Sequence, residues 1–165
     1  MITVSQLNSW LGKSIGEICL NGYTRSSDNH CAHFVCHALS LSFGYDCKKA
    51  TGKKNFGANL RVHELFDRCS NREAIKTTSS GFKGIVFVSA SDNFVTRKGI
   101  TSLENVPKKH VGIIIDGLVW HYSNSRGLVI QQSLSEFILH YPNQQNSLWF
   151  GSTPSGYVAH SFGES

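Results

Sequence analysis

The sequence lacks the segments that would assign the chain to a secreted, membrane-spanning or disordered class. Its first residues carry neither the basic region nor the apolar run of a signal peptide, so we expect synthesis in the cytoplasm. Export, where it occurs, would then use a dedicated secretion system or release by lysis. No apolar run approaches the length of a membrane span. With 40% hydrophobic and 16% charged residues, the 165-residue chain has the balance of a folded protein, and we predict one domain over residues 1–165.

The sequence also lacks an arginine-rich helix or any motif of a nucleic-acid-binding fold. Sixteen lysines and arginines against eleven aspartates and glutamates give a net charge of +5. The lysines form small clusters at 48–49, 53–54 and 108–109. This moderate excess favours anionic surroundings such as cell-wall polymers or anionic membrane surfaces. We therefore predict no specific nucleic-acid partner.

Cysteines are present without the spacing of a disulfide framework. Their number is odd, and they stand at positions 19, 31, 36, 47 and 69. At least one thiol therefore stays outside any disulfide in a monomer, which favours a reducing compartment or a catalytic cysteine.

Hydrophobic periodicity predicts helices in the first part of the chain and strands in the second, an α+β class. Expected helices run from about 4 to Gly12, from 31 to Gly44, around 60–66, and from a Ser133–Glu136 capping box to 139. Expected strands of an antiparallel meander cover 84–88, 111–115, 118–122, 128–130 and part of 148–162. Residues 45–58 and 89–109 are polar and are predicted to be connections.

Cys31 is predicted to open the second of these helices, after a cap supplied by Asp28 or Asn29. Backbone N–H groups and the positive end of the dipole stabilise an anion in the first helical turn, which lowers the pKa of a thiol there. A buried structural cysteine is more typical of mid-helix, the position of Cys36. The alternative is that Cys31 is a small core residue.

Two histidines are candidates for the base and its orienting partner. His110 opens an apolar strand, and Asp116-Gly117 is a hairpin signal that directs the next strand back past it. His121 on that second strand would lie towards the open end of the hairpin, like His110. A polar group beside a catalytic imidazole holds its tautomer, so His121 is the predicted third member of a triad, with Asn124 and Gln131 in reserve.

The rival constellation is a metal site in the stretch His30, Cys31, His33, Cys36 and His37. At 100° per residue, positions 33 and 37 lie about 200° and 240° from position 31, near the opposite helix face. The Cys-x4-Cys spacing also differs from the tight knuckles of structural zinc sites. The sequence therefore predicts no metal and no cofactor, and it predicts His33 and His37 on an outer or partly buried face.

Four motifs in order resemble the NlpC/P60 cysteine peptidases. Asn29-His30-Cys31-Ala32-His33-Phe34-Val35 resembles the family's Asp-Cys-Ser-Gly-Phe-Val nucleophile motif, and Gly84-Ile85-Val86-Phe87-Val88 resembles its Gly-Asp-Leu-Val-Phe-Phe strand. His110-Val111-Gly112-Ile113-Ile114-Ile115-Asp116-Gly117 resembles its His-Val-Gly-Ile-Tyr-x-Gly strand, and Trp120-His121 resembles its later hydrophobic-His element. His30 replaces the family's acid and Ala32-His33 its Ser-Gly.

The resemblance implies a papain-like α+β fold, with the nucleophile helix packed on an antiparallel sheet, and a triad of Cys31, His110 and His121. It implies metal-free hydrolysis of amide bonds in bacterial cell-wall stem peptides. The departures are compatible with a divergent branch, such as CHAP-type amidases or amidase toxins injected into rivals and restrained by an immunity partner. Other acyl transfer on the same triad, a catalytically silent peptide-binding module and a metal-binding domain remain alternatives.

Overall fold

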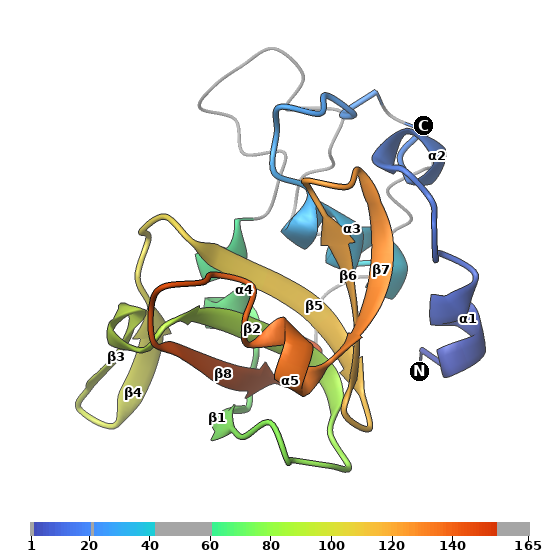
Figure 1. The fold of residues 1–165 in the computed structure, drawn as a ribbon. Helices are drawn as coiled ribbons and strands as arrows, with labels where there is room; N and C mark the ends of the chain where they lie inside the picture. The colour runs from blue at the N-terminus through green and yellow to red at the C-terminus, as the bar shows by residue number, and fades with distance from the viewer. Residues whose placement is uncertain (1, 21, 42–60, 155–165) are drawn as a thin grey trace. The chain divides into compact units, whose positions relative to one another are not determined.

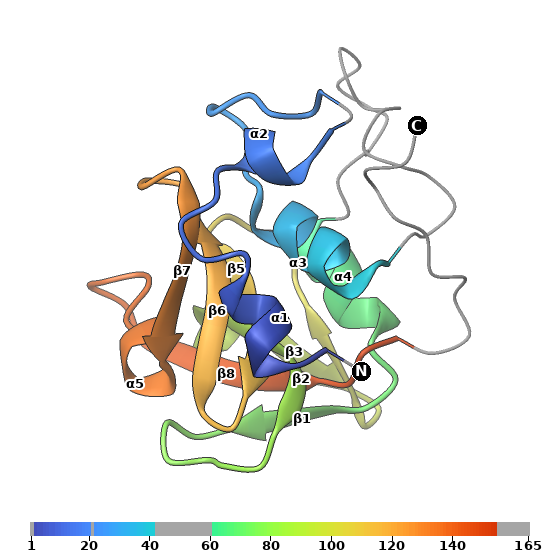
Figure 2. The same cartoon turned by 90° about the vertical axis from the view of Figure 1, so that its right-hand side faces the viewer.

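The computed structural model describes residues 2–20, 22–41 and 61–154 (Figures 1 and 2). The chain divides into two units. Among the described residues, the first unit holds 2–20, 22–41, 61 and 120–130, and the second holds 62–119 and 131–154. Short helices occur in both units and antiparallel strand pairs occur in the second, so the predicted α+β class is confirmed. Among the described residues, no helix has the length and hydrophobicity needed to span a bilayer.

Two short helices begin the first unit, and each starts with a capping box. Thr3 and Gln6 cap α1 (Val4–Asn8). Ser14 and Glu17 cap α2 (Ile15–Ile18), a helix that was not predicted although Ser-x-x-Glu is a capping signal. The α1 helix ends at Asn8 rather than at Gly12, because Gly12 donates its N–H to the Val129 carbonyl (3.0 Å) instead of to a helical turn.

The α3 helix (Cys31–Leu39) begins at the predicted residue. Its C-terminus was predicted at Gly44, which lies outside the described residues, but the helix already ends at Leu39. Ser40 adopts a left-handed conformation (φ 54°), and its N–H bonds to the last-turn carbonyls of Cys36 and His37. A residue with positive φ ends a helix in the way that glycine usually does.

The β6 strand (Leu118–Ser123) and the β7 strand (Leu128–Ser133) start in one unit and end in the other. In the first unit, alternate β6 side chains contact the N-terminal residues. The Trp120 indole donates to the Asn8 side-chain oxygen (3.0 Å), and the Tyr122 hydroxyl accepts from the Ile15 N–H (3.2 Å). Because side chains alternate along a strand, His121 projects from the other face of β6.

The main sheet of the second unit is built from antiparallel strand pairs. It contains β1 (Arg72–Ile75), β8 (Asn146–Gly151), β2 (Lys83–Ala90) and β5 (Lys109–Ile115). The full strand order is β1-β8-β2-β5-β6-β7. A simple meander was predicted, and this is correct only for β5, β6 and β7. The last strand, β8, inserts between β1 and β2 (Figure 1), an arrangement that no local pattern encodes.

The predicted connection 89–109 contains structure that the sequence analysis missed. After a short 3₁₀ turn, η2 (Ser91–Asn93), the chain forms a hairpin of β3 (Phe94–Arg97) and β4 (Ile100–Leu103). Lys98 and Gly99 form its two-residue turn with positive φ values of 52° and 77°, the combination that matches the twist of a hairpin. Only Leu103 of the eight strand residues is buried, so the two strands lack the apolar alternation that predicts a strand.

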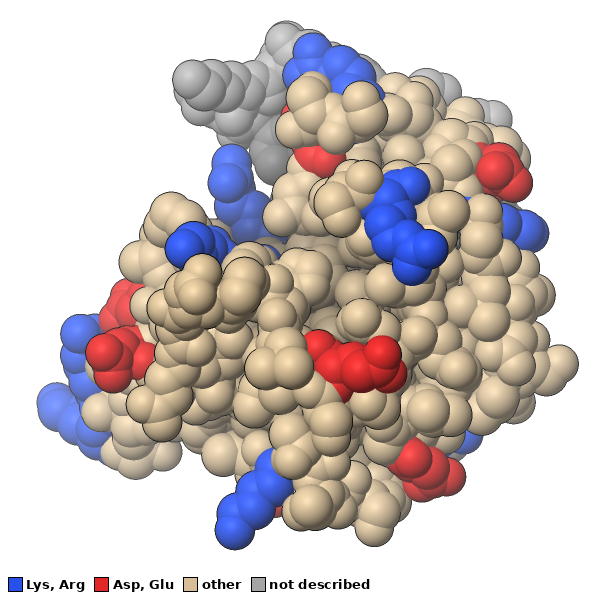
Figure 3. Space-filling model, viewed as in Figure 1, with Lys and Arg blue, Asp and Glu red and all other residues tan. Residues whose placement is uncertain are grey.

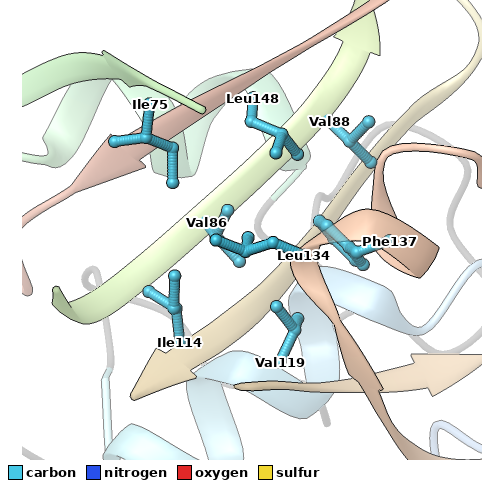
Figure 4. Packing of buried hydrophobic residues seen from close by; sticks show 8 residues of the cluster. All are labelled: Ile75, Val86, Val88, Ile114, Val119, Leu134, Phe137 and Leu148. Carbon is cyan, nitrogen blue, oxygen red and sulfur yellow. The ribbon is translucent and has the colours of Figure 1, made fainter. Parts of the chain in front are cut away.

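A hydrophobic cluster lies between one face of this sheet and α5 (Leu134–Phe137) (Figure 4). The buried members are Ile75, Val86, Val88, Ile114, Val119, Leu134, Phe137 and Leu148. Burying each such side chain contributes about 1.5–3 kcal/mol. On the other face of β2, Phe87 makes an edge contact with Phe66 of α4 (Val62–Arg68), with ring centres 5.0 Å apart. Two helices therefore cover opposite faces of β2.

Charged side chains of both signs are dispersed on the face shown in Figure 3. On that face the described residues form no continuous basic stripe.

Candidate functional site

Cys31 is the first residue of α3 and is 1% exposed. The helix has nine residues, so its N-terminal N–H groups and dipole are directed at the position of this side chain. The predicted cap differs in detail. His30 is the N-cap residue without a side-chain cap bond, Asn29 accepts from the Cys31 N–H (3.0 Å), and Asp28 instead pairs with Arg25 (3.3 Å).

Two asparagines fix the turn that precedes Cys31. The Asn124 side chain accepts from the His30 N–H (2.9 Å) and donates to the Asn29 side-chain oxygen (3.0 Å), which also accepts from Cys31. Asn124 was predicted as a reserve third member of the triad. Its amide is instead used to hold the residues that enter α3, so it is a positioning residue for the start of this helix. Residue separations of 94 and 95 explain why the sequence does not reveal these bonds.

Three histidines form a hydrogen-bonded chain beside Cys31. His30 Nδ1 lies 3.0 Å from His33 Nδ1, and His33 Nε2 lies 3.0 Å from His37 Nε2. His33 is 2% exposed, so the prediction of an outer or partly buried face is wrong for it and holds only for the partly buried His37. Burial lowers the pKa of both His30 and His33 from the ordinary value of 6.5. Tyr23 makes an edge contact with the His33 ring (5.2 Å between centres), and a hydrogen bond with Cys19 partly opposes the effect of burial on the His33 pKa.

His110 lies on β5 in the second unit and is 1% exposed. It pairs with Val88 of β2, so its side chain shares the sheet face that α5 covers. Its ring stacks on that of His140, with centres 3.9 Å apart and planes 6° apart, and lies 5.7 Å from the Phe137 ring. The strand and this stacking restrict the imidazole to a narrow range of orientations. His140 was not predicted, because nothing local marks it as a neighbour of His110.

His140 gives the second unit a pH dependence of stability. Burial lowers the pKa of its imidazole below 6.5. Below pH 6.5 the unfolded chain therefore takes up a proton that the folded protein resists, and the free energy of unfolding falls as the pH drops towards the lowered pKa. Between pH 7.5 and pH 5, we expect urea titrations to show a smaller decrease in the free energy of unfolding for His140→Gln than for the wild type. Equal losses in the two proteins would contradict this.

The other candidates for the triad, His121 and Gln131, lie in different units. His121 is 1% exposed on β6 and belongs to the first unit together with Cys31 and Asn124. Gln131 belongs to β7 in the second unit and is exposed. The first unit therefore contains the predicted nucleophile and the predicted orienting residue, and the second contains the predicted base.

The remaining described cysteines differ from Cys31 in their surroundings. Cys36 is 2% exposed in the middle of α3. Cys69 follows α4, and its burial raises the pKa of the thiol to about 12, with a smaller opposing effect of the Arg72 charge. A thiol with that pKa is protonated at neutral pH and is a poor nucleophile. None of the described cysteines is in a disulfide, which agrees with the expectation from their odd number.

Comparisons with protein-family models, with curated proteins and with solved structures find no match to this chain.

Proposed function

We propose that the protein is a cysteine hydrolase that cleaves amide bonds in the stem peptides of bacterial cell-wall peptidoglycan. Cys31 is the nucleophile, His110 the general base and acid, and His121 the residue that orients His110. The fold is papain-like, of the NlpC/P60 type that the four sequence motifs resemble. The observation that carries the proposal is Cys31 in the first turn of α3, held there by Asn29 and Asn124.

The position of Cys31 supports a nucleophilic role because thiolate chemistry needs a site that stabilises negative charge. The first turn of α3 supplies backbone N–H groups that have no acceptor within the helix itself, together with the positive end of the helix dipole. The hydrogen bonds of Asn124 to Asn29 and His30 hold this turn in one geometry. A nucleophile held by a second layer of hydrogen bonds is preorganised for attack.

The reaction proceeds in two steps. His110 takes the proton of the Cys31 thiol, the thiolate forms a C–S bond to the carbonyl carbon, and the C–N bond breaks as His110 returns the proton to the leaving amine. Water then attacks the thioester with His110 again as base. This step releases the carboxylic acid and restores the thiol. His121 accepts or donates a hydrogen bond that keeps the His110 tautomer constant.

The oxyanion that forms in each step needs a hydrogen-bond donor. The Cys31 N–H occupies the right place at the helix N-terminus, but it donates to the Asn29 side chain. For the Cys31 N–H to serve as the oxyanion donor, the substrate oxygen has to replace the Asn29 side-chain oxygen as its acceptor. The 1% exposure of Cys31 likewise means that substrate binding has to displace residues that cover the thiol.

Substrate and partners follow from the same resemblance. A stem peptide of peptidoglycan is the substrate, and an immunity protein that restrains the enzyme or a secretion partner that delivers it would bind elsewhere on the chain. The net charge of +5 supports association with the anionic cell wall.

Thiol alkylation during peptidoglycan digestion tests the proposal. The parent protein carries Cys47→Ser, because Cys47 lies outside the described residues. Cys19, Cys31, Cys36 and Cys69 are all 3% exposed or less, so burial alone predicts similar slow alkylation by iodoacetamide. We expect Cys31 to react first because its thiolate is activated, and the release of shortened or uncrosslinked stem peptides to fall in parallel.

Mass spectrometry identifies both the alkylated cysteine and the released peptides, so one experiment gives the nucleophile and the bond. Activity that survives full alkylation of Cys31 would refute its role. A folded wild type that releases no peptide would instead favour another acyl substrate or a peptide-binding module.

A further inference from the structure

We propose that Cys19, His33 and His37 form a binding site for a single zinc ion, with His30 as the residue that orients His33. Two of the side chains come from α3 and the third from the C-cap of α2, all in the first unit, and none belongs to the proposed triad. The site is therefore separate from the proposed hydrolytic chemistry.

The backbone brings the three ligands together. His33 and His37 are four residues apart on α3, so they lie on one face of the helix, one turn from each other. Cys19 is the residue that ends α2, where its N–H still bonds to the Ile15 carbonyl (2.8 Å). Because α2 contacts α3, the thiol reaches the two imidazoles. Figure 2 shows the two helices in this arrangement.

The ligand atoms have the separations that a tetrahedral ion needs. One ligand atom from each residue lies within 4.8 Å of the other two, and the Nε2 atoms of His33 and His37 are 3.0 Å apart. With Zn–N near 2.0–2.1 Å and Zn–S near 2.3 Å, tetrahedral ligands are about 3.3 Å apart for two nitrogens and about 3.6 Å for nitrogen and sulfur. Small rotations of these side chains therefore suffice to bind an ion.

Hydrogen bonds set the tautomer that makes His33 a ligand. The Arg25 carbonyl can only accept, so His30 donates to it from Nε2 (2.7 Å). A neutral His30 then accepts at Nδ1, and His33 donates from its own Nδ1 (3.0 Å). The lone pair of His33 is left on Nε2, which faces His37. Metal-binding histidines typically donate their other ring N–H in this way to a fixed acceptor.

The chemistry of the donors selects the ion. One thiolate and two imidazoles suit zinc, whereas magnesium and calcium take oxygen ligands. Cys19 and His33 are each 2% exposed, and His37 is partly exposed, so an ion enters from the His37 side. Three protein ligands leave the fourth tetrahedral position to water or to an external ligand. Tyr23 covers the rings of His30 and His33 with edge contacts and shields the site from bulk water.

Cobalt replaces zinc as a spectroscopic probe. The full chain, freed of metal by a chelator and carrying Cys47→Ser, is titrated with Co²⁺ alone. We expect one tight equivalent with the visible bands of a tetrahedral ion and a near-ultraviolet thiolate-to-cobalt band, both removed by added Zn²⁺. Cys19→Ser removes the thiolate band. His37→Gln weakens binding at least tenfold, and His30→Gln weakens it about 10–100-fold through His33.

Cys31→Ser and Cys36→Ser are the matched controls, because both lie on α3 and neither belongs to the ligand set. They should bind Co²⁺ like the parent protein. His37→Gln changes a partly exposed side chain, so it keeps the test valid if Cys19→Ser does not fold. The proposal is overturned if the parent binds no cobalt, if the thiolate band survives Cys19→Ser, or if it is lost in Cys31→Ser. Because Cys31→Ser keeps the ion, a failure of the proposed hydrolase and a failure of the zinc site are distinguishable.

Discussion

Replacing Cys31 by alanine is expected to reduce peptidoglycan hydrolysis to the uncatalysed rate, a loss on the order of 10⁵-fold or more in kcat. The thiolate supplies the covalent step, and without it neither His110 nor the helix N-terminus has a bond to form. The substitution removes one sulfur atom from a side chain that is 1% exposed, so the fold should persist. The measurement is the initial rate of peptide release by equal amounts of each protein, and mass spectrometry quantifies the released peptides.

Cys36→Ala is the matched control for this loss. It removes the same atom type from the same helix at a side chain of 2% exposure, and it should change the rate by less than a factor of about three because Cys36 has no part in the mechanism. Thermal unfolding followed by circular dichroism shows whether both variants are folded. A folded Cys31→Ala protein with the wild-type rate would place the nucleophile elsewhere.

A double variant tests whether Cys31 and His110 act as one unit. Residues that share one catalytic step are strongly non-additive, so Cys31→Ala with His110→Gln should be no slower than Cys31→Ala alone. Independent contributions would instead multiply the two losses.

The largest expected loss of stability comes from Gly151→Ala in β8. A Cβ at this position would lie 2.6 Å from Cys69 Sγ, 2.9 Å from Cys69 Cβ and 3.1 Å from the Phe87 ring. Cys69 cannot easily yield, because its N–H and thiol bond to carbonyls at the end of α4. We expect the free energy of unfolding to fall by about 3 kcal/mol, measured as a lower urea midpoint with an unchanged m-value.

Gly16→Ala is the corresponding control in α2. A Cβ there would meet only Ser14 Oγ at 3.8 Å, and alanine favours a helix, so stability should stay equal or rise by about 0.5–1 kcal/mol. Cys69→Gly removes two of the atoms in contact, so it should partly restore Gly151→Ala in a double-mutant cycle. Purely additive effects of these two substitutions would exclude the proposed clash.

Local patterns were sufficient for the elements that carry the candidate catalytic residues. The apolar stripe that begins at Cys31 predicted the start of α3, and Asp116-Gly117 predicted the β5–β6 hairpin on which His110 and His121 lie. Both signals depend on residues that are close in sequence. The β1 strand was missed because it has four residues, of which only Ile75 is buried, and because its partner β8 lies more than seventy positions later.

The surroundings of the candidate residues could not be predicted for the same reason. Asn124 reaches Asn29 across 95 positions, and His140 stacks on His110 from beyond two further strands. The i, i+4 spacing of His33 and His37 is visible in the sequence, but the approach of Cys19 to them is not. Cys19 approaches these histidines through the packing of α2 on α3, which is tertiary information.

The position of β8 has a consequence for how the chain folds during its synthesis. Residues 72–75 and 83–90 emerge from the ribosome early, yet in the sheet they are separated by a strand at 146–151. The edge of β2 that pairs with β8, including the segment Ile85–Ala90, therefore stays without its native neighbour until some sixty further residues have been made. At about 5–20 residues per second this interval lasts several seconds. During that time the exposed edge of an apolar strand is a substrate for chaperones and a site of premature association.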